Sequence, residues 1–125
     1  MKQVEPKNII AYLNTKITWL GNRIIFWLPI EEQSGIYLTL NILTESQADY
    51  SKWTLFEFAF IGHNEEVSFE DLLAFRKLVS NELIGNKDLS GFYVYWCSED
   101  GGFINWYDEK NRKVIKQNYR FYFTK

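Results

Sequence analysis

Apolar side chains recur at three- and four-residue intervals in one stretch of the chain, and this period predicts a main helix over residues 68–84. Ser68 stands at the N-cap position, and Asp71 follows three residues later in the spacing of a capping box. Gly85 comes directly after the last periodic residue and predicts a glycine C-cap. The stripe that we expect to face a core contains Leu72, Phe75, Val79 and Leu83, widened by Phe69 and Leu78.

Alternating apolar and polar residues predict strands on both sides of this helix. The strictest alternation runs through residues 36–42, and a second alternating run covers residues 53–61. Earlier in the chain, the apolar runs 16–20 and 23–30 are separated by Gly21-Asn22, a two-residue hairpin signal. After the helix, we expect strands at residues 92–97, 103–107 and 114–123.

The order of these elements predicts one α+β domain over residues 1–125. We expect an antiparallel sheet of about seven strands, in two meander-like halves, packed against the one main helix. Residues 98–102 and 108–113 are interpreted as hairpin loops of the second half, and residues 6–14 as a short helix with Pro6 in its first turn. The alternative is a β-sandwich with one helix.

Large aromatic side chains occupy both faces of the predicted strands, whereas one helix covers only one face. The second face must therefore pack on another layer, curl onto itself, form a dimer, or stay partly open. An open aromatic face favours recognition, because Trp and Tyr are common anchors of protein interfaces. The sequence leaves these alternatives open.

Composition limits the class of protein. Aromatic residues make up 18% of the 125 residues, with only two Pro and seven Gly, which favours an ordered, β-rich fold. No apolar run approaches the length of a membrane span and the start lacks a signal-peptide core, so we expect a cytoplasmic protein without a membrane segment. The single cysteine, Cys97, excludes an internal disulfide and a cysteine-based zinc site.

The net charge of −2 conceals an uneven distribution. Residues 110–125 carry six basic residues and no acidic one, whereas residues 1–109 carry all 16 acidic residues and eight basic ones, a net charge of −8. The chain thus has an acidic body and a basic C-terminal segment. One interpretation of this segment is a solvated strand that lies against an acidic neighbour.

Adjacent acidic pairs fall mostly in the predicted connections between elements. Because alternate turns of a meander lie at the same end of a sheet, we expect three pairs to converge on one rim, with Asp108-Glu109 at the opposite end. Such a rim would speed association with a basic partner and repel nucleic acid, although acidic residues are also common in solvated turns. The candidate partner-binding residues are Glu31, Glu32, Glu65, Glu66, Glu99 and Asp100, with Trp106 or Tyr107 as an aromatic anchor.

Catalytic chemistry has little support in the sequence. His63 and Cys97 are one conceivable pair of base and nucleophile, but no local motif accompanies either residue. The chain contains no phosphate-binding glycine loop, calcium loop or zinc-protease motif. We therefore expect no catalytic residue, no metal site and no cofactor.

In size, acidic body, aromatic content and α+β layout, the chain resembles the small bacterial immunity proteins that neutralise a cognate toxin, including those of contact-dependent growth-inhibition systems. The resemblance rests on these general features, so no family residue is carried over. It implies a cytoplasmic, non-enzymatic inhibitor that binds one basic toxin domain, often a nuclease, and covers its active site. The oligomeric state stays open, with a dimer among the alternatives.

A second hypothesis is a module that binds single-stranded nucleic acid. In it, Tyr93, Tyr95, Trp106 and Tyr107 stack on bases, while Arg112, Lys113, Lys116 and Arg120 contact phosphates. The acidic body opposes this hypothesis. A third, a small enzyme or ligand-binding domain, requires a deep pocket with convergent polar groups.

Overall fold

The computed structural model describes residues 4–17, 24–25, 35–46, 52–62, 67–89, 92–108 and 111–124. It contains two helices, α1 (Pro6–Lys16) and α2 (Phe69–Leu83). The strands are β1 (Ile24–Ile25), β2 (Ile36–Glu45), β3 (Trp53–Gly62), β4 (Lys87–Leu89), β5 (Phe92–Glu99), β6 (Ile104–Tyr107) and β7 (Lys113–Thr124). No helix among these described residues is long and apolar enough to cross a lipid bilayer.

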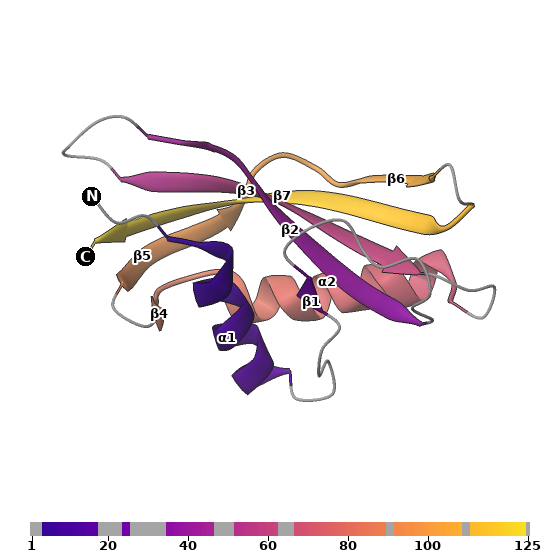
Figure 1. Ribbon diagram of the computed structural model, residues 1–125, viewed down its shortest axis with the longest axis horizontal. Coiled ribbons are helices and arrows are strands. Elements are labelled where there is room, and N and C mark those ends of the chain that lie inside the picture. Colours follow the sequence, from indigo (N-terminus) through magenta and orange to yellow (C-terminus); the bar gives the residue numbers. More distant parts are fainter. Residues whose placement is uncertain are drawn as a thin grey trace.

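All the described strands belong to one sheet, in the order β1-β2-β3-β7-β5-β4, with β6 paired to β7 beside β5. Every pairing is antiparallel except that of β1 with β2. Both helices lie on one side of this twisted sheet (Figure 1). The predicted α+β class and the antiparallel sheet packed on a helix are confirmed, and the two-sheet alternative is not formed by the described strands.

The predicted meander-like halves are wrong. The last strand, β7, does not continue a row of neighbours but lies in the centre of the sheet, between β3 and β5. Ten residue pairs join it to β3, from Trp53 opposite Tyr122 to Gly62 opposite Lys113. The cause is that β7 is long and strongly apolar on alternate positions, so its best-buried place is the middle of the sheet.

Helix α2 begins and ends where its sequence predicts. The backbone N–H of Asp71 donates to Ser68 Oγ at 3.1 Å, and the backbone N–H of Ser68 donates to Asp71 Oδ2 at 3.0 Å, which completes the capping box. Gly85, with a φ of +105°, follows the last turn in the left-handed conformation that glycine favours. Leu78, expected in the apolar stripe, is instead 39% exposed, whereas the buried positions are Leu72, Phe75, Val79, Ser80 and Leu83.

The N-terminal helix α1 is longer than the predicted residues 6–14. It buries Ile9 and Leu13 and extends to Lys16, which was expected to begin a strand. The predicted hairpin turn Gly21-Asn22 lies outside the described residues. Of the run 23–30, the structure describes only β1, which pairs parallel to β2 with Ile24 opposite Leu38.

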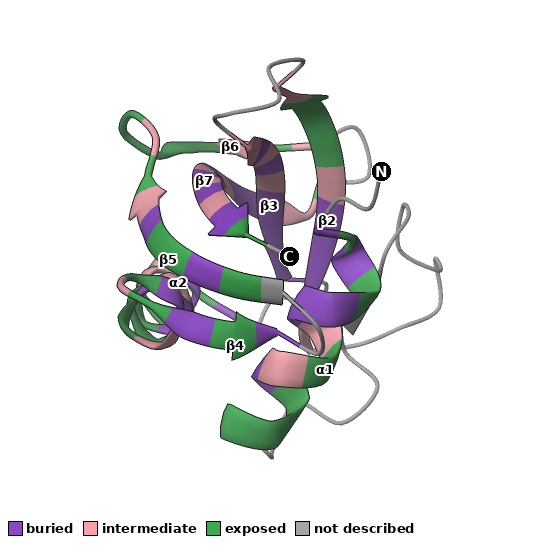
Figure 2. Ribbon diagram, turned by 90° about the vertical axis from the view of Figure 1, so that its left-hand side faces the viewer, coloured by how far each residue is buried: buried purple, intermediate pink, exposed green. Residues whose placement is uncertain are grey.

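The core lies between the sheet and the two helices. Phe56 of β3 meets Phe121 of β7 edge to face, with ring centroids 5.4 Å apart, and Phe60 meets Phe75 of α2 in the same way at 5.3 Å. The fully buried rings are Phe56, Phe58, Phe60, Tyr119, Phe121 and Phe123. Figure 2 shows the buried stretches of β3, β7 and α2.

Candidate protein-binding surface

Strands β5 and β6 lie in line along the same edge of β7. Residues 93–99 pair with residues 119–124, and residues 104–107 pair with residues 113–116. Together the three strands form one long hairpin whose turn is at residues 108–112. The predicted hairpin loop at 108–113 is therefore confirmed, whereas the loop predicted at 98–102 is wrong, because β5 and β6 do not pair with each other.

An irregularity in β5 turns its large rings outward. The register between β5 and β7 shifts between Val94 and Trp96, so Tyr95 is an extra residue without a partner in the ladder. A bulge of this kind breaks the alternation of faces. As a result Val94 and Cys97 face the core and are fully buried, while Tyr95 and Trp96 are 44% and 49% exposed.

A larger irregularity separates β5 from β6. Residues 100–103 oppose only two residues of β7, since Glu99 pairs with Tyr119 and Ile104 with Lys116. The side-chain amide of Gln117 donates to the Gly101 carbonyl at 3.0 Å and holds this segment against β7. Gly101 has a φ of +82°, a conformation that a residue with a side chain rarely adopts.

A polar network ties the same segment to α2. Arg76 Nη1 donates to Glu99 Oε2 at 2.7 Å and to Gln117 Oε1 at 3.2 Å, and the Arg76 guanidinium lies 4.5 Å from the ring centroid of Phe103. Ser80 Oγ donates to Glu99 Oε2 at 2.8 Å and is also hydrogen-bonded to the buried Tyr119 hydroxyl. Burial raises the pKa of the Tyr119 phenol, so this hydroxyl stays protonated. The network fixes the position of the segment between β5 and β6.

The result is a strip of exposed apolar side chains that we call the aromatic edge. Six of the ten exposed large apolar residues of the described chain fall within residues 93–107. Ile104 and Tyr107 are the most exposed of the six, at 64% and 55%. Figure 2 shows β6 and much of β5 as exposed. The aromatic edge consists of Tyr93, Tyr95, Trp96, Phe103, Ile104 and Tyr107.

The predicted acidic rim is described only in part. Glu31, Glu32, Glu65 and Glu66 lie outside the described residues. Glu99 and Asp100 are not in a turn at one end of the sheet, as the meander required, but at the junction of β5 and β6 beside α2. Glu99 is paired with Arg76 at 2.7 Å and Asp100 with Arg120 at 3.5 Å.

The two predicted aromatic anchors differ in exposure. Tyr107 belongs to the aromatic edge and meets Phe69 of α2 edge to face at 5.3 Å. Trp106 points to the opposite side of the sheet, is only partly exposed, and packs against Ala59, Ile61 and Val114. Tyr107 is thus accessible to a partner, whereas Trp106 covers a small second cluster.

The basic C-terminal segment is paired with the acidic body. Arg112 Nε lies 2.7 Å from Asp108 Oδ2, and Lys116 Nζ lies 3.3 Å from Glu57 Oε1. Lys116 also lies over the Trp106 ring at 4.9 Å, as Arg120 does over Trp53 at 4.3 Å. These contacts agree with the interpretation of the segment as a strand against an acidic neighbour.

The conceivable nucleophile is buried. Cys97 is fully enclosed in the core, and burial raises the pKa of its thiol to about 12, so the reactive thiolate is suppressed. His63 lies outside the described residues.

Lys87 caps the C-terminus of α2. Its Nζ donates to the Leu83 carbonyl and to the Gly85 carbonyl, the latter at 3.1 Å. Burial lowers the pKa of this amine.

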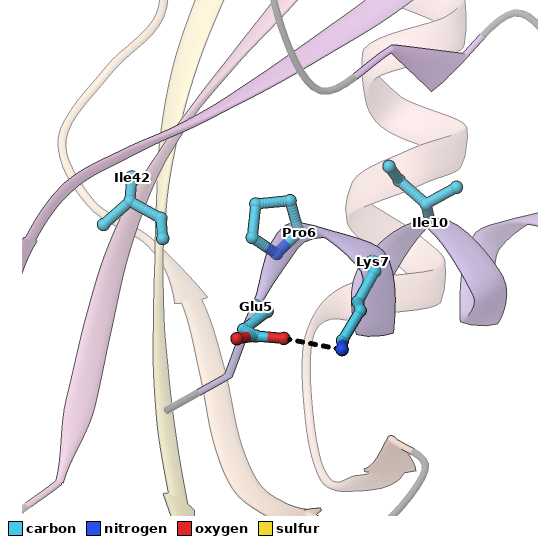
Figure 3. A pocket seen from close by; sticks show the side chains of 5 residues that line it. All are labelled: Glu5, Pro6, Lys7, Ile10 and Ile42. Atoms are coloured by element: carbon cyan, nitrogen blue, oxygen red, sulfur yellow. Dashed lines mark ion pairs between the residues drawn. The ribbon is translucent and has the colours of Figure 1, made fainter. Parts of the chain in front are cut away.

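A groove of about 400 Å³ lies between the start of α1 and β2, lined by Glu5, Pro6, Lys7, Ile10 and Ile42 (Figure 3). Its described charges, Glu5 and Lys7, pair with each other at 3.1 Å. A ligand site of the usual kind combines an apolar lining with several convergent polar groups, and the described lining supplies only this exposed pair. Nor do any three His, Cys, Asp or Glu side chains of the described residues gather as metal ligands.

Comparison with known proteins identifies the fold. No protein-family model matches the chain, and no curated protein matches it. Among solved structures, a chain of the virion of a native gene transfer agent (GTA) particle aligns with a TM-score of 0.69 and 15% sequence identity. The alignment covers 94% of this chain and 92% of that chain. At this identity the likeness is one of fold alone.

Sequence reasoning did not single out Trp96, Phe103 or Ile104 as surface residues. Periodic alternation assigns Tyr95 and Trp96 to opposite faces, and only the bulge brings both into the open. Two signals in the sequence point to the region. Gly101-Gly102 interrupts a strongly aromatic run, and the tetrapeptide Ile104-Asn105-Trp106-Tyr107 contains no charge.

Proposed function

We propose that this chain is a non-enzymatic protein-binding module whose contact surface is the aromatic edge. The observation that carries the proposal is the concentration of six exposed large apolar side chains within residues 93–107. These side chains lie along one strand edge and reach both faces of the sheet, since Tyr107 contacts α2 whereas Ile104 lies on the face of Trp106. A concentration of exposed apolar side chains is unfavourable in water unless a partner covers it, and Tyr and Trp are enriched among the residues that dominate binding energy.

The rigidity of the surface supports a binding role. The segment between β5 and β6 is held by the contacts of Arg76, Gln117 and Ser80 rather than by the aromatic rings alone. A surface that is ordered before binding loses less conformational entropy when the partner arrives. The rings are therefore presented in a fixed arrangement.

For the partner, we propose a basic protein domain, in the manner of an immunity protein that covers a toxin. The support is the net charge of −8 on residues 1–109, which favours encounter with a cationic surface. A chain of similar fold belongs to the virion of a native gene transfer agent (GTA) particle, and this likeness concerns the fold alone.

The nucleic-acid hypothesis gains less support. Of the four cations assigned to phosphate contacts, Arg112, Lys116 and Arg120 lie in ion pairs with acidic residues. Each pair would have to open before the cation could release counterions from a nucleic acid. Trp106, assigned to base stacking, is partly covered by Lys116.

The test is comparative capture of the partner from the native host. The tagged wild type is compared with a variant carrying Tyr95→Ser, Trp96→Ser and Ile104→Ser. A matched control carries Leu43→Ser, Leu78→Ser and Ile84→Ser, three similarly exposed apolar residues elsewhere on the molecule. Bound species are identified by mass spectrometry, and circular dichroism verifies folding of all three proteins.

We expect the wild type and the control to retain one stoichiometric basic protein, and the aromatic-edge variant to lose it. Equal retention by all three proteins would place the contact elsewhere and contradict the proposal. Recovery of nucleic acid in place of protein, sensitive to salt, would support the stacking hypothesis instead.

A further inference from the structure

We propose that the module binds by strand addition, with an extended segment of the partner pairing along the open edge of β6. The partner segment is expected to be apolar on alternate positions and to carry a basic residue that faces the first turn of α2. The inference rests on the proposed protein-binding function and adds the mode of binding and the chemistry of the bound segment.

The first observation is that β6 has an unpaired side. Within the described residues β6 pairs with β7 alone, through four residue pairs from Ile104 opposite Lys116 to Tyr107 opposite Lys113. In Figure 1, β6 forms the border of the sheet above β7. An edge strand presents a row of backbone N–H and C=O groups to which another strand can bind.

The register shows which backbone groups point outward. At the turn, the Asp108 N–H donates to the Arg112 carbonyl at 2.9 Å, and the Arg112 N–H donates to the Asp108 side chain at 2.8 Å, so Asp108 and Arg112 occupy a hydrogen-bonded position in the register of β6 with β7. Such pairs alternate along an antiparallel ladder, so Trp106 and Ile104 bond to β7. The N–H and C=O groups of Asn105 and Tyr107 consequently point away from β7.

The second observation is that β6 itself carries none of the side-chain protection of an edge strand. Natural edge strands avoid unwanted pairing through charged side chains, proline, bulges, short length or covering elements, and of these β6 has only its short length and the bulge before it among the described residues. The tetrapeptide Ile104-Asn105-Trp106-Tyr107 has neither charge nor proline, and Ile104 and Tyr107 are the two most exposed members of the aromatic edge. An unprotected, apolar edge is what strand addition requires, because backbone bonds supply affinity and alternate side chains supply specificity.

Charge complementarity identifies the occupant. The Tyr107 ring contacts Phe69, the first residue of α2, and the exposed acids Glu70 and Asp71 follow in the same turn. A strand that lies against β6 on this side passes the two carboxylates, which favour a Lys or Arg in the incoming segment. A second copy of this chain would bring its own β6, which has no basic residue. The occupant is therefore a segment of a basic partner.

The first experiment uses a defined probe, the acetylated and amidated peptide Lys-Thr-Ile-Thr-Ile-Thr-Ile-Lys. Two control peptides carry Glu at both ends, or Pro in place of the second Ile. Amide hydrogen exchange of the full chain is followed by NMR. We expect the lysine peptide to slow exchange at Asn105 and Tyr107 by about tenfold or more, with little change at Trp106, whose N–H already bonds to β7. Neither control peptide should do so.

A backbone variant tests the mode directly. Asn105→Pro removes one outward N–H at a position where an edge strand accepts proline, whereas the matched control Asn105→Ala keeps that N–H and removes the side chain. After circular dichroism confirms that both fold, we expect peptide binding to be lost in the first and retained in the second. Wild-type binding by Asn105→Pro, or protection confined to other strands, would overturn the proposal.

Two further outcomes separate the hypotheses. If protection of Asn105 and Tyr107 rises with protein concentration alone and sedimentation shows a dimer, the occupant is a second copy and the proposal is wrong. If Asn105→Pro still captures the partner from the host while the aromatic-edge variant does not, strand addition fails and the protein-binding function stands. If both variants capture it as the wild type does, the proposed function itself fails.

Discussion

Two groups of large apolar, mostly aromatic residues in this molecule have similar chemistry, but one group is buried and the other is exposed. The first, Phe56, Phe58 and Phe60 with Tyr119, Phe121 and Phe123, lies on the helix-facing side of β3 and β7 and is almost entirely buried. The second is the aromatic edge, which runs along β5, β6 and the segment between them. Its five aromatic residues and Ile104 are 40% to 64% exposed. Both groups come from strands rich in Phe, Tyr and Trp.

The difference comes from what covers each group, and not from the residues themselves. Helix α2 lies across β3 and β7 and covers their rings, whereas it meets the aromatic edge only at its border, through Phe69 beside Tyr107 and Arg76 beside Phe103. The bulge at Tyr95 places Tyr95 and Trp96 in exposed positions. Burial of a ring stabilises the folded chain, while an exposed ring is available to a partner. Substitutions in the two groups should therefore separate stability from binding.

The largest effect on stability is expected in the first group. Phe58 is fully buried and touches Phe56, Phe60 and Tyr119. Phe58→Ala should lower the free energy of unfolding by about 3 to 5 kcal/mol, because it removes buried apolar surface and leaves a cavity. Urea denaturation followed by tryptophan fluorescence measures this change. A loss below about 1 kcal/mol would mean that this core is not closed as described.

A smaller effect is expected where the two groups meet. Glu99→Gln keeps the shape of the side chain but removes the charge that accepts hydrogen bonds from Arg76 and Ser80. We expect the free energy of unfolding to fall by about 1.5 kcal/mol, the lower end of the range for hydrogen bonds to charged groups, because the Glu99 side chain is partly exposed. The exchange rates of amides in residues 100–103 should rise in the same variant. Unchanged exchange there would show that the network does not hold the segment.

The sequence predicted well those parts of the fold that depend on the spacing of apolar and capping residues close together in the chain. The capping box of Ser68 and Asp71 and the alternating rings of β3 were predicted correctly, since each depends on residues close together in the chain. The hairpin turn at 108–113 was predicted for the same reason. The buried face of α2 was predicted at Leu72, Phe75, Val79 and Leu83, and wrongly at Leu78.

Long-range pairing and irregular backbone were not predictable in this way. The length and alternation of β7 favour a central position, but they do not show that its neighbours are β3 and β5, because that pairing depends on contacts distant in sequence. The extra residue Tyr95 reverses the faces of everything that follows it in β5, and periodicity alone does not detect it. The acidic rim was built on the meander, so the described part of it, Glu99 and Asp100, lies elsewhere.

Cys97 and Trp96, adjacent residues of opposite exposure, give a finer test. Burial raises the pKa of the Cys97 thiol from an ordinary value of 9.0 to about 12. The contribution of the protonated thiol to the free energy of unfolding is therefore complete below pH 9. It is lost as the pH rises from 9 toward 12, because the thiol of the unfolded chain ionises first. We expect a loss of about 1 kcal/mol by pH 9.5 that the Cys97→Ala variant lacks. Denaturation at pH 7.5 and 9.5, compared between the two proteins, measures it. Equal losses would indicate an accessible thiol.

The smallest effect on stability is expected at the aromatic edge, at its most exposed residue. A small loss of stability there would separate a role in binding from a role in folding. Ile104→Ser should change the free energy of unfolding by no more than about 0.5 kcal/mol, because its side chain is 64% exposed. Trp96→Ser, at a ring that is 49% exposed, should cost about 1 to 2 kcal/mol, well below the cost of Phe58→Ala. Urea denaturation of each single variant, beside Phe58→Ala, measures the contrast. A loss of several kcal/mol at Trp96 would assign its ring to the core and remove the main support for a binding surface. A small loss, in a variant that no longer captures the partner, would mean that the exposed rings act in recognition rather than in folding.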